Sequence, residues 1–171
     1  MVVAGLGPAK NGNHHAMRYR KHIRLKNYDY KTDGFYFVTL CSAYKEPLLK
    51  KLGDILETEL QNLPVRFPGL KIDYHKIMPS HLHAILILDN CGKSLSEIVG
   101  AYKSITTLKT RVAIRSFQKS ALQEGHLWQP NYYEHIIRSE ASLSKIRQYI
   151  EDNPLAEKLQ WDQVRKERSL T

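Results

Sequence analysis

The stretch Met78-Pro79-Ser80-His81-Leu82-His83-Ala84-Ile85-Leu86-Ile87-Leu88 places two histidines at the entrance of a run of aliphatic residues. Side chains of a β-strand alternate between its two faces, so His81 and His83 are predicted to point the same way. Both faces of residues 84–88 are apolar, which indicates a central strand that is covered on both sides. Polar rings in that position are costly to bury without a partner, and a metal ion is a partner that two imidazoles can share. An isolated pair with this spacing is also compatible with ordinary structural histidines, so a metal site requires a third group.

The length and charge of the chain limit its class. At 171 residues it fits one domain, and the excess of 26 Lys and Arg over 17 Asp and Glu gives a formal net charge of +9. Such a balance favours a polyanionic partner, either nucleic acid or an anionic membrane surface. No run approaches the roughly 18 apolar residues of a membrane span, so nucleic acid is preferred and no membrane association is expected. The first residues lack the features of a signal peptide, which predicts a cytoplasmic protein. Cys41 and Cys91 are expected to be free thiols.

The elements that precede the histidine strand follow from local patterns. Residues 34–40 are rich in β-formers and predict a first strand. Leucines and isoleucines between Leu48 and Leu63 then repeat at roughly helical spacing, and Pro64 is expected to end that helix. After a turn at Pro68-Gly69, Leu70–Ile77 predicts a second strand that forms an antiparallel hairpin with the histidine strand.

Two further elements follow the hairpin. Ser94 and Glu97 fit a capping box and predict the start of a long helix. Residues 127–137 indicate a final strand with an irregular, aromatic beginning. The buried stripe of the long helix is predicted to comprise Leu95, Ile98, Val99, Tyr102, Ile105, Leu108 and Val112.

The last predicted helix carries a tyrosine and an amide on one side. Ser139 is a plausible N-cap, and the helix should run from Glu140 to about Asn153, because Pro154 disfavours its continuation. Leu143, Ile146 and Ile150 define its buried stripe. Tyr149 and Asn153 are four residues apart and are therefore predicted to face the same way.

The order strand, helix, strand, strand, helix, strand predicts an α+β fold, a ferredoxin-like βαββαβ sandwich with an antiparallel sheet and an additional C-terminal helix that carries the tyrosine. We expect a disordered N-terminal segment at 1–17, a single folded domain at 18–155 and a basic C-terminal tail at 156–171. The segment 18–26 is a basic arm that could follow a phosphate backbone or could be a solvated edge. Lys103 and other cations of the long helix have the same two interpretations.

Taken together, these motifs resemble the single-tyrosine HUH transposases, in particular the REP-associated tyrosine transposases of bacteria. The similarity extends from about Arg18 to Leu155. It rests on Arg20-Lys21-His22-Ile23-Arg24-Leu25, Gly34-Phe35-Tyr36-Phe37-Val38-Thr39, Met78-Pro79-Ser80-His81-Leu82-His83, Trp128-Gln129, Tyr133-Glu134-His135-Ile136-Ile137-Arg138 and Ile146-Arg147-Gln148-Tyr149-Ile150-Glu151-Asp152-Asn153-Pro154.

The resemblance implies a site and a reaction. His81 and His83 would be ligands of Mg²⁺ or Mn²⁺, with Asn153 as the third ligand, and Tyr149 would be the nucleophile that forms a 5′-phosphotyrosine intermediate. The implied substrate is single-stranded DNA folded as a hairpin, a REP-like palindrome, which the enzyme cleaves and rejoins as a monomer or homodimer. Residues expected to contact DNA are Arg18, Arg20, Lys21, Arg24, Lys103 and Trp128, the last by stacking on an unpaired base.

Two other functions are compatible with the same residues. One is a hairpin DNA- or RNA-binding regulator that keeps the fold without chemistry. The other is a metal-dependent hydrolase in which water attacks in place of Tyr149. The removal of the Tyr149 hydroxyl distinguishes them, because hydrolysis by water would survive that change.

Overall fold

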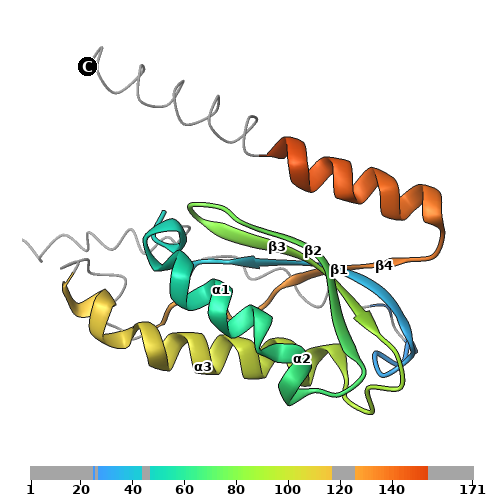
Figure 1. The fold of residues 1–171 in the computed structure, drawn as a ribbon, viewed down its shortest axis with the longest axis horizontal. Helices are drawn as coiled ribbons and strands as arrows, with labels where there is room; N and C mark the ends of the chain where they lie inside the picture. Colours follow the sequence, from blue (N-terminus) through green and yellow to red (C-terminus); the bar gives the residue numbers. More distant parts are fainter. Residues whose placement is uncertain (1–24, 26, 44–46, 117–125, 154–171) are drawn as a thin grey trace, which may run out of the picture.

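The computed structural model describes residues 25, 27–43, 47–116 and 126–153, and they form a four-stranded antiparallel sheet with helices on both faces (Figure 1). The strands are β1 (Gly34–Cys41), β2 (Leu70–Ile77), β3 (His81–Leu88) and β4 (Tyr133–Ile137), in the spatial order β2-β3-β1-β4. This order and the helices that connect the strands confirm the predicted α+β, ferredoxin-like fold. The predicted terminal segments 1–17 and 156–171 lie outside the described residues.

One face of the sheet is covered by the helices that connect its strands. They are the 3₁₀ helix η2 (Leu49–Leu52), α1 (Gly53–Gln61), the one-turn α2 (Leu63–Arg66) and the long α3 (Leu95–Ser116). The opposite face carries a helix formed by residues 140–153, here called the tyrosine helix, which follows β4 directly (Figure 1). The sheet therefore separates two layers of helix, and β3 is an inner strand, as its sequence predicted.

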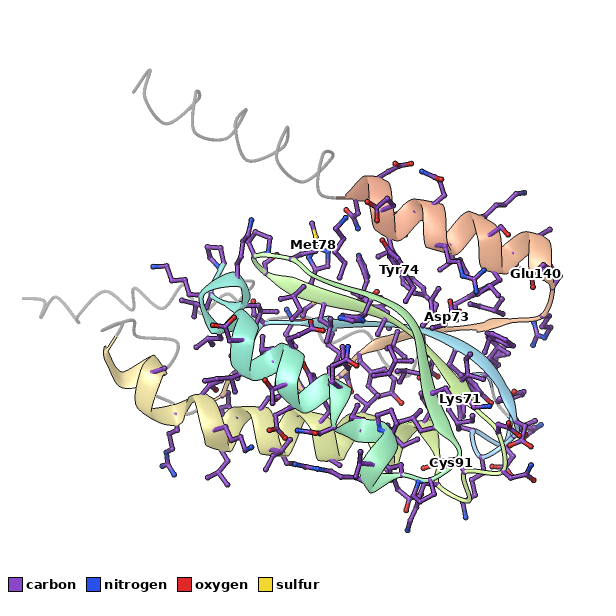
Figure 2. The ribbon with its side chains drawn as sticks, viewed as in Figure 1. Lys71, Asp73, Tyr74, Met78, Cys91 and Glu140 are labelled. Atoms are coloured by element: carbon purple, nitrogen blue, oxygen red, sulfur yellow. The ribbon has the colours of Figure 1, made fainter. Side chains whose placement is uncertain are left out.

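Two apolar clusters lie on the two sides of the sheet, and β3 contributes to both (Figure 2). Leu82, Ala84 and Leu86 belong to the larger cluster beneath α1 and α3. Ile85 points the other way and packs with the tyrosine helix, where the smaller cluster lies. The smaller cluster consists of Ile85, Ile137, Leu143 and Ile150, with Phe35, Phe37, Tyr74 and Ile146 packed against it. The period of two in the β3 sequence thus sets which core each residue enters.

Both predicted helix starts are present. The Ser94 amide donates to the Glu97 carboxylate at 2.9 Å, and the Glu97 amide donates to the Ser94 hydroxyl at 3.3 Å, which completes a capping box at the start of α3. The Ser94 hydroxyl also donates to the Glu97 carboxylate at 2.9 Å, and the two bonds from the Ser94 amide and hydroxyl, together with Lys93, lower the pKa of the exposed Glu97 carboxyl to about 2. The Ser139 hydroxyl accepts a hydrogen bond from the Ser142 amide at 3.2 Å, as expected of an N-cap.

Three details of the predicted elements are wrong. Pro64 does not end the helical stretch: α1 already ends at Gln61, and Pro64 occupies the first turn of the separate helix α2, where its missing N–H costs nothing. Leu108 of the predicted stripe is 64% exposed, and Thr106 and Thr110 are buried in α3 because their hydroxyls donate to the carbonyls of Tyr102 and Thr106. The final strand is confined to β4, and Trp128 pairs with Ser42 only through an isolated bridge.

The turn that joins α2 to β2 brings two backbone segments close together. The Leu70 amide donates to the Phe67 carbonyl at 2.9 Å around Pro68 and Gly69, and Gly69 has φ +88°. A Cβ at Gly69 would lie 2.3 Å from the Asp89 carbonyl oxygen and 2.8 Å from the Cys91 Cα. This glycine is therefore required both by its left-handed backbone and by the approach of the chain that follows β3.

Replacing Gly69 by alanine is expected to lower the free energy of unfolding by more than about 2 kcal/mol, because both strain and a backbone clash are introduced. The matched control is Gly92→Ala, which has φ +65° but no atom within 4 Å of the added Cβ, and it should cost only about 1 kcal/mol. Urea denaturation measures both values. Equal losses in the two variants would contradict the role assigned to the close approach.

Candidate functional site

The two histidines of β3 point toward each other on the face that carries the tyrosine helix. The Nε2 atoms of His81 and His83 lie 3.1 Å apart, and the centroids of the two rings lie 4.5 Å apart. His83 is only 3% exposed, whereas His81 at the end of the strand is partly buried. The predicted shared orientation of the two imidazoles is therefore observed.

His83 has a partner at each ring nitrogen. Its Nδ1 lies 2.9 Å from the hydroxyl oxygen of Thr39, which is its register neighbour on β1. Its Nε2 lies 2.6 Å from the side-chain amide of Asn153 on the tyrosine helix. Burial, with a smaller contribution from His81, lowers the pKa of His83 from 6.5 to about 3. The ring is thus neutral at physiological pH, which is the form that can donate a lone pair to a metal.

This arrangement fits the requirements of a divalent cation. Metal–imidazole bonds of about 2.1 Å at near-right angles separate two ligand nitrogens by roughly 3 Å, close to the 3.1 Å between the Nε2 atoms. A half-turn of the Asn153 amide would exchange its nitrogen for its oxygen, which is a suitable cation ligand. Among the described residues, His, Cys, Asp and Glu form no cluster of three or more that could hold a metal, so an amide is the third donor that the fold offers here.

Tyr149 lies beside the histidine pair and is accessible. Its ring centroid is 5.6 Å from that of His83 and 6.1 Å from that of Phe37, and the residue is 53% exposed. Tyr149 precedes Asn153 by one helical turn, so the same helix face presents both side chains to His83. The fold therefore brings together all four residues that the resemblance selected, although they come from β3 and from a helix some 70 residues later.

Sequence reasoning missed the residues that support His83 and His81. Thr39 could have been noticed as a polar residue in the β1 pattern, but its place opposite His83 depends on the β1–β3 register. The Ser80 hydroxyl lies 3.3 Å from Nδ1 of His81, next to it in the sequence. Both hydroxyls approach Nδ1 atoms, which leaves the Nε2 atoms to face each other.

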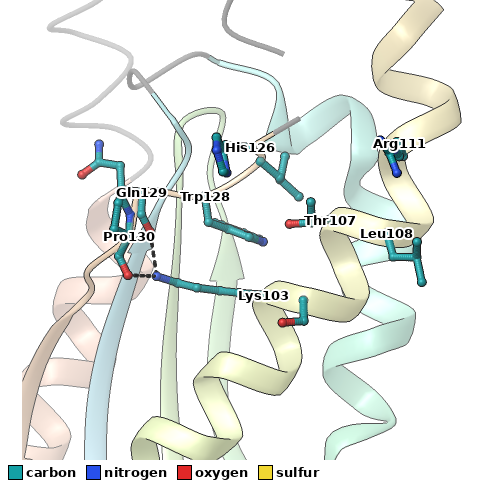
Figure 3. Close-up of a pocket in the computed structure, with 10 residues that line it drawn as sticks. Lys103, Thr107, Leu108, Arg111, His126, Trp128, Gln129 and Pro130 are labelled. Carbon is teal, nitrogen blue, oxygen red and sulfur yellow. Dashed lines mark hydrogen bonds between the residues drawn. The ribbon is translucent and has the colours of Figure 1, made fainter. Parts of the chain in front are cut away.

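The residues expected to contact DNA have mixed outcomes. Arg18, Arg20, Lys21 and Arg24 lie outside the described residues. Lys103 extends from α3 toward a neighbouring loop and donates to the carbonyls of Gln129, Pro130 and Asn131 at 2.8, 3.3 and 3.0 Å (Figure 3). Trp128 is 6% exposed and donates from Nε1 to the Thr106 hydroxyl at 2.8 Å. In this conformation Lys103 and Trp128 connect the loop to α3, and little of the indole is available for stacking.

The loop and α3 enclose an open hollow of about 540 Å³, in which Lys103, Arg111, His126 and Trp128 contribute to the lining (Figure 3). Its lining comes from α3 and from the loop residues 126–130, and α3 lies on the opposite side of the sheet from the tyrosine helix. His75 also lies away from the histidine pair, and its Nε2 contacts the Glu57 carboxylate of α1 at 2.8 Å. The convergent His81, His83 and Asn153 therefore remain the candidate metal site.

In the part of the chain that the structure describes, no helix has the length and apolarity needed to cross a bilayer.

Comparison with known proteins identifies the family to which the chain belongs. The family described as transposase IS200-like matches residues 31–153, so the chain belongs to the IS200-like transposases. An uncharacterized protein of Haemophilus influenzae is 33% identical over 86% of this chain and 92% of its own length. A second protein of that organism, provisionally named a REP-associated tyrosine transposase, is 22% identical over 77% of each chain.

Solved structures show the same fold. A REP-associated tyrosine transposase bound to a REP hairpin matches with a TM-score of 0.61 and 20% identity, over 78% of this chain and 73% of its own. A protein of Deinococcus radiodurans R1, provisionally described as a transposase, matches with a TM-score of 0.53 and 22% identity, over 75% and 95% of the two chains. These matches confirm the resemblance to REP-associated tyrosine transposases that the sequence motifs predicted, and with it a transposase role.

Proposed function

We propose that the protein cleaves and rejoins single-stranded DNA at hairpin sites through a 5′-phosphotyrosine intermediate formed by Tyr149. The observation that carries the proposal is the meeting of Tyr149 and Asn153 with His83, whose Nε2 also faces that of His81. An accessible phenol beside a pair of convergent imidazoles is suited to transesterification at a phosphodiester.

In the proposed step the Tyr149 oxygen attacks the scissile phosphorus. The Tyr149 O–P bond forms as the phenol loses its proton, and the bond to the 3′-oxygen breaks to leave a free 3′-OH. Because the new phosphotyrosine is itself a phosphodiester, a second 3′-OH can reverse the reaction and join other ends without ATP. The 53% exposure of Tyr149 gives a DNA strand access to the phenol.

We assign His81, His83 and Asn153 as the residues that would hold the divalent ion, Mn²⁺ or Mg²⁺. Such an ion, when bound, supplies polarisation of the phosphate and stabilisation of the leaving 3′-oxygen. The Thr39 hydroxyl fixes the orientation of the His83 ring, and Ser80 does the same for His81. Two imidazoles and one amide leave coordination positions open for phosphate oxygens.

The proposed partner is hairpin DNA, since a fold neighbour of 20% identity was solved bound to a REP hairpin and the chain carries a formal charge of +9. Arg18, Arg20, Lys21 and Arg24 remain the proposed phosphate contacts. We propose a cytoplasmic enzyme that acts as a monomer or homodimer.

Tyr149→Phe is expected to abolish the covalent DNA–protein adduct, because it removes only the attacking oxygen. The assay incubates purified protein and Mn²⁺ with labelled single-stranded hairpin DNA from the sequence that flanks its gene, and resolves the products on a denaturing protein gel. The matched control is Tyr133→Phe, since Tyr133 on β4 is also exposed and pairs in register with Thr39. That variant should retain the adduct.

Other outcomes of this assay lead to different functions. An adduct that persists in Tyr149→Phe and disappears in Tyr133→Phe would move the nucleophile to β4. Strand cleavage without any adduct, unchanged in Tyr149→Phe, would indicate attack by water. Tight hairpin binding without cleavage, both with Mn²⁺ and with Mg²⁺, would favour a non-catalytic binding protein.

Thr39→Val is expected to weaken Mn²⁺ binding about 10- to 100-fold, because the variant loses the hydrogen bond that orients His83. His83→Ala should abolish binding at this site. Isothermal titration calorimetry measures both, with Thr58→Val as a control, since the Thr58 hydroxyl donates to the Asp54 carbonyl within α1. Unchanged Mn²⁺ affinity in Thr39→Val and His83→Ala would disprove the assigned site.

A further inference from the structure

β2 contains an irregularity opposite the tyrosine helix. Ile72 pairs with Leu86 and Tyr74 pairs with Ile85, so Asp73 is an extra residue that has no register partner on β3. Such a bulge changes the face to which the following side chains point. Ile72 packs in the cluster beneath α1 and α3, whereas Tyr74 packs in the cluster beneath the tyrosine helix. The bulge therefore directs Tyr74 toward the face of the sheet that carries the tyrosine helix.

The residues at and after the bulge form polar contacts with the tyrosine helix. The Arg147 guanidinium donates from Nε and Nη2 to the two oxygens of Asp73, at 2.8 and 2.5 Å, in a bidentate pair. The Tyr74 hydroxyl donates to the Glu151 carboxylate, and the Lys76 Nζ lies 3.3 Å from the same carboxylate. Figure 2 shows Asp73 and Tyr74 on the side of the sheet where this helix lies. We call these five residues the β2 clamp.

The charges in the clamp support one another. The hydrogen bond to Asp73 raises the pKa of Arg147, and the Tyr74 hydroxyl together with Lys76 lowers the pKa of the Glu151 carboxyl. The Asp73 side chain is only 14% exposed, so its pairing with Arg147 is better shielded from solvent than a surface ion pair. The bidentate geometry at the shielded Asp73 carboxylate therefore adds direction to the attraction between the charges.

The position of the clamp around the helix axis gives it a specific role. Arg147 and Glu151 are one turn apart and lie on one side of the stripe that buries Ile150. Tyr149 and Asn153 are also one turn apart, and they lie on the other side of that stripe, toward His83. Rolling the helix about its axis would separate one of these pairs from the sheet. A clamp on the β2 side therefore sets how far Tyr149 and Asn153 reach toward β3.

We propose that Asp73 and Arg147 are positioning residues, and that the bulged β2 strand fixes the roll of the tyrosine helix so that Tyr149 meets its target phosphate beside His83. The inference rests on the proposed function for its effect on rate. The clamp itself consists of contacts between β2 and the helix, and its effect on the helix can be measured without DNA.

The test compares Arg147→Ala and Asp73→Ala in the full chain with Asp89→Ala. The control breaks an exposed ion pair with Lys71, at the end of the β2–β3 hairpin opposite its turn, and neither residue of that pair belongs to the β2 clamp. At saturating hairpin DNA and Mn²⁺, the rate of adduct formation should fall about 10- to 100-fold in both clamp variants, because small displacements of a reacting group are costly. The Kd for the same DNA should change by less than about two-fold, since the strand-binding surface is unaltered. Asp89→Ala should match the wild type in both.

Two further readouts separate positioning from a general loss of structure. Arg147→Lys keeps one charged donor and should recover part of the rate. Amide hydrogen exchange over residues 147–153 should rise about ten-fold in Arg147→Ala, while exchange in β3 stays at the wild-type value. Arg147→Ala alters only the helix, so the test stands even where Asp73→Ala fails to fold.

The outcomes are distinguishable from failure of the proposed function. If the wild type forms no adduct, the nucleophile assignment fails, and the clamp is judged by exchange alone. Wild-type rates in both clamp variants overturn the inference, as does unchanged exchange over 147–153. A loss of DNA affinity equal to the loss of rate also overturns it, because Arg147 would then be a DNA contact.

Discussion

The structure around the site depends on burying one neutral imidazole, that of His83, with both ring nitrogens in contact with polar groups. Those groups come from three separate segments: Thr39 from β1, His81 from β3 itself and Asn153 from the tyrosine helix. An unpaired polar ring in that position would be costly to desolvate. The β1–β3 register and the docking of the helix therefore both serve this ring, since an error in the register would remove Thr39 from Nδ1 and an undocked helix would leave Nε2 facing only His81.

Much of the fold could be predicted because it follows from local rules. The alternation along β3 indicated its central place and the shared face of His81 and His83, and the capping box located the start of α3. The spacing of Tyr149 and Asn153 indicated one helix face. Their meeting with the histidines could not be obtained from spacing, because it requires the last helix to cross the sheet. That expectation came from the family resemblance, which the comparisons confirm at the level of the family.

The features that escaped prediction depend on contacts between distant segments. Thr39 matters because of its register with His83, and the Asp73 bulge appears only in the pairing of β2 with β3. Leu108 satisfied the helical period, yet α3 turns Thr106 and Thr110 inward, where backbone carbonyls accept their hydroxyls. A periodic pattern of apolar residues does not reveal that a threonine can be buried by bonding to its own helix.

The pairing of cations with carboxylates within the fold affects how steeply DNA binding by the protein depends on salt concentration. Several lysines and arginines of the described residues lie beside carboxylates, among them Arg66 and Lys109 with Glu59, Lys71 with Asp89, and Lys76 with Glu151. A cation that already has a protein counter-charge displaces few condensed ions from a nucleic acid. The total of 26 lysines and arginines therefore overstates the steepness with which DNA binding weakens as salt is added. That steepness therefore depends mainly on cations that have no carboxylate beside them.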